Sequence, residues 1–454
     1  MPRRLRALLL SAGSVLAAVV LLPPSRADDF GKFLERAAGK TLRQALAPQD
    51  SQRPSPAVGK RQRPAQAPAP NDEGQGPQTG LMSTLAPGLF PGSSPAEHGE
   101  PLAIRTADGW TLVAHRYKPT GPPRAGAMPV ILCHGLTYNA LFWDLIPECS
   151  FAEYLSSQGF DVWAVSLRGS GLSQKWVWRT DDLPSVFLGA ATRRLTHGKI
   201  PPSGYASIDP KYANWNLDQH SAYDVPALVT LVRRHTKAPE VAWVGHSMGG
   251  IVALCHLERY GNPGIGRLVT VGSQVTMPKG RLPLEFCGEM IRARQQQLAG
   301  QVTRQQLVAQ QLVEQTQTGV HNLFFNVANA DPRVYEALSG GWATDIPAIA
   351  LMQQYTTLSS KGVLLDAQQR YNYAEHLDNI KIPIFISCGA QDNFAPPAVQ
   401  QYLYNHVGST DKTLVIFGQA QGMTVDAGHD DALVGLNSRE QVYPLIARWL
   451  APGS

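Results

Sequence analysis

The chain has 454 residues, of which 43% are hydrophobic, so it is long enough to bury a sizeable core. Its formal net charge of +5 is only weakly basic, and no dense run of Lys and Arg marks a face for nucleic acid, which excludes nucleic acid as an expected partner. Five cysteines are too few for a fold held together by disulfides, even in an oxidising compartment.

The N-terminus carries the pattern of a cleaved export signal. Arg3, Arg4 and Arg6 precede an apolar run from Ala7 to Leu22, which is followed by Pro23-Pro24 and the small-residue site Ser25-Arg26-Ala27. We expect 1–27 to be a signal peptide cleaved after Ala27, and the protein to be exported to the periplasm or the outside of the cell. An uncleaved membrane anchor is the alternative, although a run of roughly 16 residues is short for a bilayer span.

The segment before the first predicted strand divides into two parts. In 28–46, apolar residues recur at helical spacing among charged ones, which predicts a short amphipathic helix. Such a helix either contacts a membrane or lipid interface or docks on its own domain. From 47 to 98 the composition turns to Pro, Gln, Gly and Ala, which cannot bury enough apolar surface to fold, so we interpret this part as a disordered linker.

From residue 99 to the C-terminus the pattern is that of an α/β domain. A hairpin is predicted from Leu102–Thr106, the turn Asp108-Gly109 and Trp110–Tyr117. Continuous apolar runs then alternate with helical patterns such as Ser221–His235, which predicts a mostly parallel central sheet with helices on both faces. The apolar runs are 129–133, 161–167, 241–245, 267–271, 382–387 and 413–417.

Two insertions interrupt this alternation, at about 171–215 and 274–378. An excursion of about a hundred residues between consecutive strands is far longer than a usual connection, so we expect 274–378 to form a helical cap over the edge of the sheet. Cys149 and Cys287 lie in irregular stretches and are the two that could pair. The other three cysteines fall in apolar patterns that predict buried thiols.

Ser247 stands in Gly245-His246-Ser247-Met248-Gly249, between a predicted strand and a predicted helix. That context is typical of a nucleophile elbow, a turn so tight that a Cβ on either flanking glycine would collide with neighbouring chain. The serine Oγ then lies at a helix N-terminus, where free N–H groups favour developing negative charge. We therefore predict that Ser247 is a nucleophile.

A serine hydroxyl needs a base to remove its proton, and the base needs a carboxylate to orient it. His429, in the loop before the closing helix Ser438–Leu450, is the predicted base. Asp392 follows the apolar run 382–387 and is the predicted acid, because Ser, Asp, His is one chain order in which such triads occur. Asp426 and Asp430 are rivals, although a carboxylate only a few residues from its histidine seldom reaches it.

The stretch His134-Gly135-Leu136 ends the apolar run 129–133. We predict that the backbone N–H groups of Leu136 and Met248 form an oxyanion hole, in which losing one donor costs about 3 to 4 kcal/mol of transition-state stabilisation. No HExxH, CxxC or EF-hand pattern occurs in the sequence, so it points to no metal, and this mechanism requires no cofactor.

Together these residues resemble an α/β-hydrolase, and several stretches are similar to the acid lipase branch of gastric and lysosomal lipases. The similar stretches are Gly159–Trp163 with Arg168-Gly169, Trp215–Asp218 with Tyr223–Ala227, and Gly428-His429 with Val434-Gly435 and Val442–Pro444. The resemblance covers 102–270 and 382–450. It implies an ester hydrolase in which Ser247, Asp392, His429, Leu136 and Met248 take the family's roles. The cap has no matching stretch, and Met248-Gly249-Gly250 is a general bacterial type of elbow, so no particular lipid is implied.

The expected function is therefore hydrolysis of carboxylic esters through an acyl-enzyme, on a small-molecule or lipid substrate. Apolar clusters at 320–327 and 342–355 of the expected cap favour medium or long acyl chains. The alternatives are a small-ester carboxylesterase, a polyester depolymerase or an acyltransferase with the same triad, and a binding module without catalysis. Product analysis and labelling by a fluorophosphonate distinguish them. Epoxide hydrolase and dehalogenase chemistry is disfavoured, because those relatives attack with Asp where this chain has Ser247.

Overall fold

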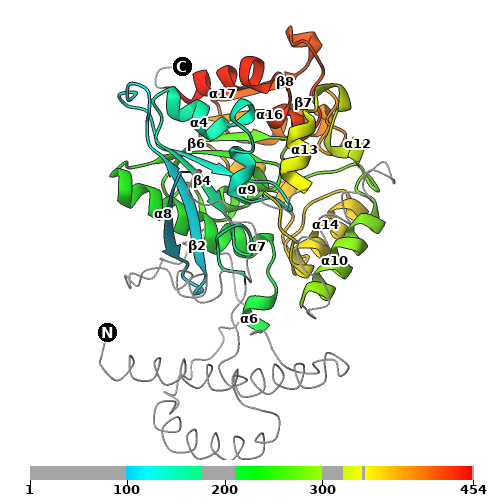
Figure 1. The fold of residues 1–454 in the computed structure, drawn as a ribbon. Helices are drawn as coiled ribbons and strands as arrows, with labels where there is room; N and C mark the ends of the chain where they lie inside the picture. Colours follow the sequence, from blue (N-terminus) through cyan, green and yellow to red (C-terminus); the bar gives the residue numbers. More distant parts are fainter. Residues whose placement is uncertain (1–98, 176–209, 299–320, 340–342, 452–454) are drawn as a thin grey trace, which may run out of the picture. The chain divides into compact units, whose positions relative to one another are not determined.

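The computed structural model describes residues 99–175, 210–298, 321–339 and 343–451, so the predicted signal peptide, amphipathic helix and linker lie outside the described residues. Its centre is an eight-stranded sheet with the order β1-β2-β4-β3-β5-β6-β7-β8 (Figure 1). The first two strands, β1 (Glu100–Arg105) and β2 (Thr111–Tyr117), form the predicted antiparallel hairpin.

The remaining strands confirm the prediction of a mostly parallel sheet. Strand β2 runs antiparallel to β4, and every other pairing from β4 to β8 is parallel. Their bounds are β3 Val130–Cys133, β4 Val162–Ser166, β5 Val241–His246, β6 Ile265–Val271, β7 Ile384–Gly389 and β8 Lys412–Phe417. The strands β3, β4, β5 and β7 are buried along their whole length, as expected for a sheet covered on both faces.

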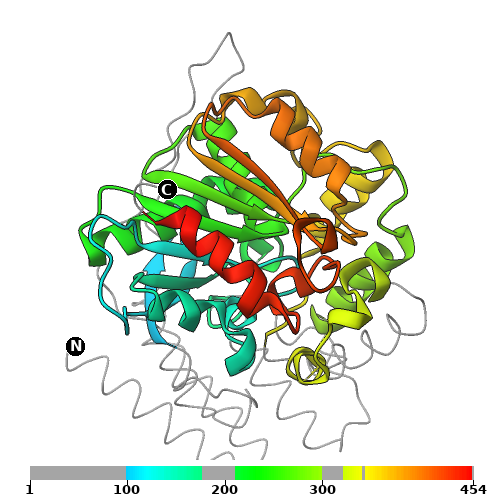
Figure 2. The ribbon, with the colours of Figure 1, turned by 90° about the horizontal axis from the view of Figure 1, so that it is seen from above.

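Helices cover both faces of the sheet, as the sequence predicts. Alternate residues of β3 divide between two core clusters: Val130 and Leu132 lie in one, Ile131 and Cys133 in the other. The first cluster includes α4 (Phe151–Ser157) and α17 (Tyr443–Leu450), and the second includes α8 (Val225–Thr236), α9 (Met248–Tyr260) and α15 (Pro397–His406). Figure 2 shows α17, in red, lying across the strands.

The insertion between β6 and β7 contributes a group of helices at the β7 side of the sheet (Figures 1 and 2). They are α10 (Leu284–Leu298), α12 (His321–Phe324), α13 (Pro332–Ser339) and α14 (Ile349–Lys361), and α10 packs against α14. Shorter helices elsewhere are α6 Pro210–Ala213, α7 Leu217–Gln219 and α16 Asp431–Val434, with single π-helical turns at His220–Asp224 and Ser438–Val442. Within the described residues, no helix has both the length and the apolar content needed to span a bilayer.

The pairing of Cys149 with Cys287, which the sequence left open, is not formed. Both thiols are free and buried, as are the other three. Cys149 belongs to the core cluster under α4 and α17, whereas Cys287 belongs to the cluster on the opposite face, so the sheet separates them. Their similar irregular sequence context carried no information about which face each would occupy.

Candidate active site

Ser247 lies between the end of β5 and the first residue of α9. Its φ of 50° is in the left-handed region, which a residue other than glycine enters at a cost and mostly at functional sites. The surrounding structure holds this conformation: Ser247 N–H donates to the Val271 carbonyl (2.8 Å), and the Ser247 carbonyl accepts from Ser273 Oγ (2.9 Å). The turn therefore presents the serine side chain at the N-terminus of a helix of 13 residues.

The predicted collision at the flanking glycines is confirmed. A Cβ on Gly245 would lie 2.2 Å from the Gly250 nitrogen, and a Cβ on Gly249 would lie 2.1 Å from the Cys133 carbonyl oxygen. Both partners are backbone atoms that cannot move independently of β3 and α9. The Gly-x-Ser-x-Gly spacing is thus a packing requirement of this turn.

His429 and Asp392 lie in direct contact, although 37 residues separate them in the chain. His429 Nδ1 is 2.8 Å from Asp392 Oδ2, and both side chains are buried. The other oxygen, Asp392 Oδ1, accepts from the N–H groups of Phe394 (3.0 Å) and Ala395 (2.6 Å), which fixes the carboxylate in the loop after β7. An acceptor at Nδ1 places the histidine proton there and leaves Nε2 as the basic nitrogen.

Gly272 makes room for this pair. Its φ is +63°, and a Cβ on it would lie 2.8 Å from His429 Nδ1 and 3.0 Å from Asp392 Oδ2. Nothing in the sequence around Gly272 marks it for this role, because it is distant in the chain from both partners. The signal that could have identified Gly272 was its position directly after β6, the strand that pairs with β5 and therefore ends beside Ser247.

The rival acids bond elsewhere. Asp426 Oδ1 accepts from the N–H of Gln419 (2.8 Å) in an exposed loop. Asp430 Oδ2 accepts from the Tyr138 hydroxyl (2.6 Å), and its other oxygen lies 3.4 Å from His246 Nε2. Of the three candidate carboxylates, Asp392 is therefore the one placed at His429 Nδ1.

The loop after β3 packs closely against the elbow. A Cβ on Gly135 would lie 2.9 Å from His246 Nδ1 and 3.3 Å from Ser247 Cβ. Only a glycine at this position therefore allows the loop that carries Leu136 to pass so close to the elbow. His134 ties the loop to the end of β4: Nδ1 bonds the Gly135 carbonyl (2.8 Å), and Nε2 accepts from Leu167 N–H (3.2 Å). Burial lowers the pKa of His134 to about 4, so its ring is neutral. This positioning role of His134 was not foreseen from the sequence.

Ser247 and His429 line one pocket together with Gly135 and Leu136. The apolar part of its wall consists of Leu282, Phe286, Phe324 and Phe394, three of which come from the insertion between β6 and β7. The Phe394 ring meets the His429 ring edge-on, with centroids 4.9 Å apart. Of the clusters expected from the sequence, Phe324 lines this pocket, Met352 and Tyr355 lie in the core, and Val320 and Trp342 lie outside the described residues.

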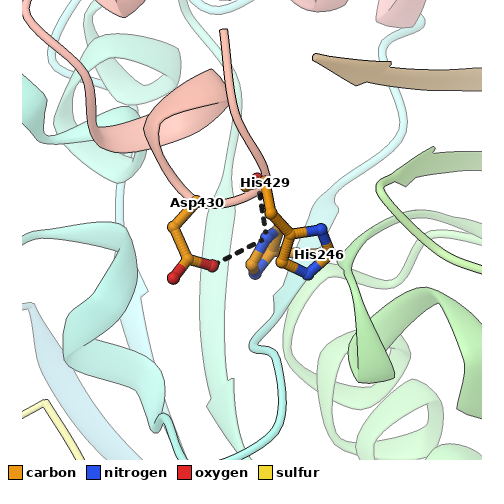
Figure 3. Close-up of side chains that lie close together, drawn as sticks. All are labelled: His246, His429 and Asp430. Carbon is orange, nitrogen blue, oxygen red and sulfur yellow. Dashed lines mark hydrogen bonds and ion pairs between the residues drawn. The ribbon is translucent and has the colours of Figure 1, made fainter. Parts of the chain in front are cut away.

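A second histidine and carboxylate lie beside His429 (Figure 3). His246 Nε2 is 3.3 Å from the His429 carbonyl oxygen and 3.4 Å from Asp430 Oδ1, and its ring stacks on Phe142. Burial, together with the neighbouring His429, lowers the pKa of His246 far below its usual value, and burial raises the pKa of Asp430 to about 7. Among the described residues, His246, His429 and Asp430 form the group whose atoms could hold a metal, within 4.8 Å of one another. Hydrogen bonds to Asp392 and Tyr138 already engage two of them.

The charge on Asp430 should affect the pH profile of any reaction that uses His429 as a base. Burial alone would lower the pKa of His429, but the Asp392 carboxylate, with Asp430 and Asp431, raises it above its usual value. Asp430→Asn removes the negative charge that Asp430 carries above its pKa of about 7 and that stabilises the imidazolium. We expect the acidic limb of the kcat/KM profile to move to lower pH, with the maximum changed less than about threefold.

The matched control is Asp426→Asn, which alters a carboxylate bonded away from the histidine and should leave the limb in place. A uniform loss of rate with no displacement of the limb would mean that Asp430 acts only through packing.

Comparison with known proteins finds lipases. Over 177 residues the chain is 28% identical to lipase member K of Homo sapiens, covering 38% of this chain and 37% of that lipase. Lipase lipl-3 of Caenorhabditis elegans is 27% identical over 163 residues, with 35% and 34% covered. Triacylglycerol lipase 2 of Arabidopsis thaliana is 27% identical over 167 residues, with 35% and 33% covered. The chain thus spans about a third of the length of these relatives.

Solved structures of similar fold include an esterase of Exiguobacterium antarcticum, with a TM-score of 0.48 and 16% identity over 77% of this chain and 99% of that one. A monoacylglycerol lipase of Paleococcus ferrophilus has a TM-score of 0.45 and 16% identity over 76% and 99%. The resemblance to lipases predicted from the sequence is confirmed by the relatives above. Since the family described as alpha/beta hydrolase fold matches residues 128–435, about two thirds of the sequence, the chain belongs to the α/β-hydrolase family.

Proposed function

We propose that the protein is a serine hydrolase that cleaves carboxylic esters, with a preference for medium or long acyl chains. The observation that carries the proposal is that Ser247, on a strained turn at the start of α9, lines one pocket with His429, whose Nδ1 lies 2.8 Å from Asp392. The apolar side chains of Leu282, Phe286 and Phe324 in the same pocket support an acyl chain as the group that binds there.

In the proposed mechanism, His429 Nε2 takes the proton of Ser247 Oγ as that oxygen attacks the ester carbonyl. The Asp392 carboxylate stabilises the resulting imidazolium through Nδ1. The N–H groups of Leu136 and Met248 receive the oxyanion, and His429 then protonates the leaving alcohol. A water molecule, activated by the same histidine, hydrolyses the acyl-enzyme and frees the acid. The residues of this chain suffice for these steps.

We also propose that the protein is exported, with cleavage after Ala27. The support is the order of basic residues, apolar run and small-residue site in 1–27. The intact mass of the protein recovered outside the cytoplasm tests this part: we expect a chain that starts at Asp28. A mass that retains Met1 would contradict it.

Acyl-chain preference tests the substrate class. We expect kcat/KM for p-nitrophenyl esters to rise from acetate to a maximum at octanoate or longer, because each buried methylene contributes up to about 0.8 kcal/mol. Soluble and dispersed substrates are assayed separately.

Phe324→Ala removes one apolar wall of the pocket and should flatten the rise with chain length. Val327→Ala, in the same segment but 66% exposed, is the matched control and should leave it unchanged. A kcat/KM that is highest for acetate and declines steadily with chain length would contradict the proposed preference and indicate a small-ester carboxylesterase.

A further inference from the structure

A second cavity shares part of its lining with the pocket of Ser247. Leu136, Thr137 and Tyr138 line both, and Met248, the other proposed oxyanion donor, lines the second one. Its apolar wall consists of Trp215, Ile346, Pro347 and Leu351. With about 20 Å³ of room, it accommodates a group the size of one water molecule or one hydroxyl.

Most polar side chains that line this cavity have hydrogen-bond partners. Arg168 bonds Asp224 and Asp108, His134 bonds Gly135 and Leu167, and Ser170 Oγ donates to the Leu167 carbonyl. Asp345 accepts from Lys175 and Asn139, and Tyr138 donates to Asp430. His220 differs. Among the described residues that line this cavity, it is the one with a buried side-chain nitrogen or oxygen, Nε2, that has no hydrogen-bond partner.

The neighbours of His220 determine what Nε2 can do. His220 Nδ1 lies 2.8 Å from Asp224 Oδ2, and Arg168 bonds Asp224 Oδ1 through Nε (2.8 Å). Burial would raise the pKa of Asp224, but the Arg168 guanidinium and His220 hold it below its usual value, so Asp224 is a carboxylate that accepts. His220 Nδ1 therefore donates, and in the imidazole tautomer with its proton on Nδ1 the lone pair lies at Nε2.

A buried lone pair without a donor is unfavourable, and the fold keeps this one next to the reaction site. His220 is 1% exposed and begins a π-helical turn, a feature frequent at functional sites. Because Nδ1 is held by Asp224 four residues further along the chain, Nε2 is the ring nitrogen left without a partner on a residue that lines the cavity.

We propose that His220 is a specificity-determining residue. A hydroxyl group of the ester substrate enters this cavity beside Leu136–Tyr138, and His220 Nε2 accepts a hydrogen bond from it. The inference rests on the proposed ester hydrolysis and adds a substrate class, hydroxyl-bearing esters. The hydroxyl can belong to the acyl chain or to the alcohol portion, and both present the same donor to Nε2.

Three esters separate the two sources. Propyl octanoate is the reference, propyl 3-hydroxyoctanoate carries the hydroxyl on the acyl chain, and 3-hydroxypropyl octanoate carries it on the alcohol. Release of the acid gives kcat/KM for each with the wild-type protein and with His220→Leu. The ratio of hydroxylated ester to reference, compared between the two proteins, cancels the intrinsic reactivity of each ester.

We expect this ratio to be about tenfold higher in the wild type than in His220→Leu for one of the two hydroxylated esters. His220→Gln, whose amide can donate to Asp224 and still offer an oxygen acceptor, should retain most of the preference. The matched control is His256→Leu. His256 is also buried with an unpaired Nε2, but it lies outside this cavity, so the ratio should stay at its wild-type value.

Equal ratios in the wild type and His220→Leu for both hydroxylated esters, with propyl octanoate still cleaved, would overturn the assignment and leave the proposed function intact. Failure to cleave all three esters would instead contradict the proposed hydrolysis itself, and this inference with it.

Discussion

Replacing Ser247 by alanine is expected to lower kcat/KM for the best ester by at least about 10⁴-fold, because the hydroxyl proposed to form the acyl-enzyme is then missing. The fold should remain, since the turn is held by backbone contacts at Gly245 and Gly249 and by the bond from Ser247 N–H to Val271. The measurement is steady-state hydrolysis, with thermal unfolding as the check on the fold.

The control for this change is Ser360→Ala, which alters an exposed serine on α14 and should be silent. Hydrolysis by folded Ser247→Ala at a tenth of the wild-type rate or more would mean that another nucleophile does the chemistry.

Removing the carboxylate behind the histidine is expected to have the second-largest effect. Asp392→Ala leaves His429 without the acceptor at Nδ1, so the ring loses both its tautomer and its orientation, and kcat should fall by about 10³- to 10⁴-fold. Some activity remains because the base itself is still present. His429→Ala removes the base and should approach the effect of Ser247→Ala.

Asp426→Ala is the matched comparison, since Asp426 lies three residues from His429 in the chain but bonds Gln419 instead. We expect nearly wild-type kcat from it. Full activity in Asp392→Ala together with loss of activity in Asp426→Ala would reverse the assignment of the acid.

The strands could be predicted because each one leaves a local pattern in the sequence. Every apolar run expected from the sequence corresponds to a strand within two residues at each end, from 129–133 for β3 to 413–417 for β8. The same holds for the candidate triad, whose members follow strands in a chain order known for such sites. The contact of His429 with Asp392, rather than with Asp426 or Asp430, was favoured by that order and by the poor reach of a carboxylate only a few residues from its histidine.

What the sequence did not reveal are contacts between residues far apart in the chain. Tyr138 and Asp430 are 292 positions apart, and nothing local to either predicts their hydrogen bond. Likewise the free space that His429 and Asp392 need depends on Gly272, and the separation of Cys149 from Cys287 depends on which face of the sheet each occupies. Such relations follow from the packing of whole elements, which periodicity does not encode.

Covalent labelling by a fluorophosphonate, followed by mass analysis of the tryptic peptides, tests most directly whether Ser247 is an activated nucleophile. We expect one adduct, on the peptide that contains Ser247, formed far more slowly in His429→Ala and absent from Ser247→Ala. A folded protein that takes no label, or one in which the adduct persists after Ser247→Ala, would contradict it.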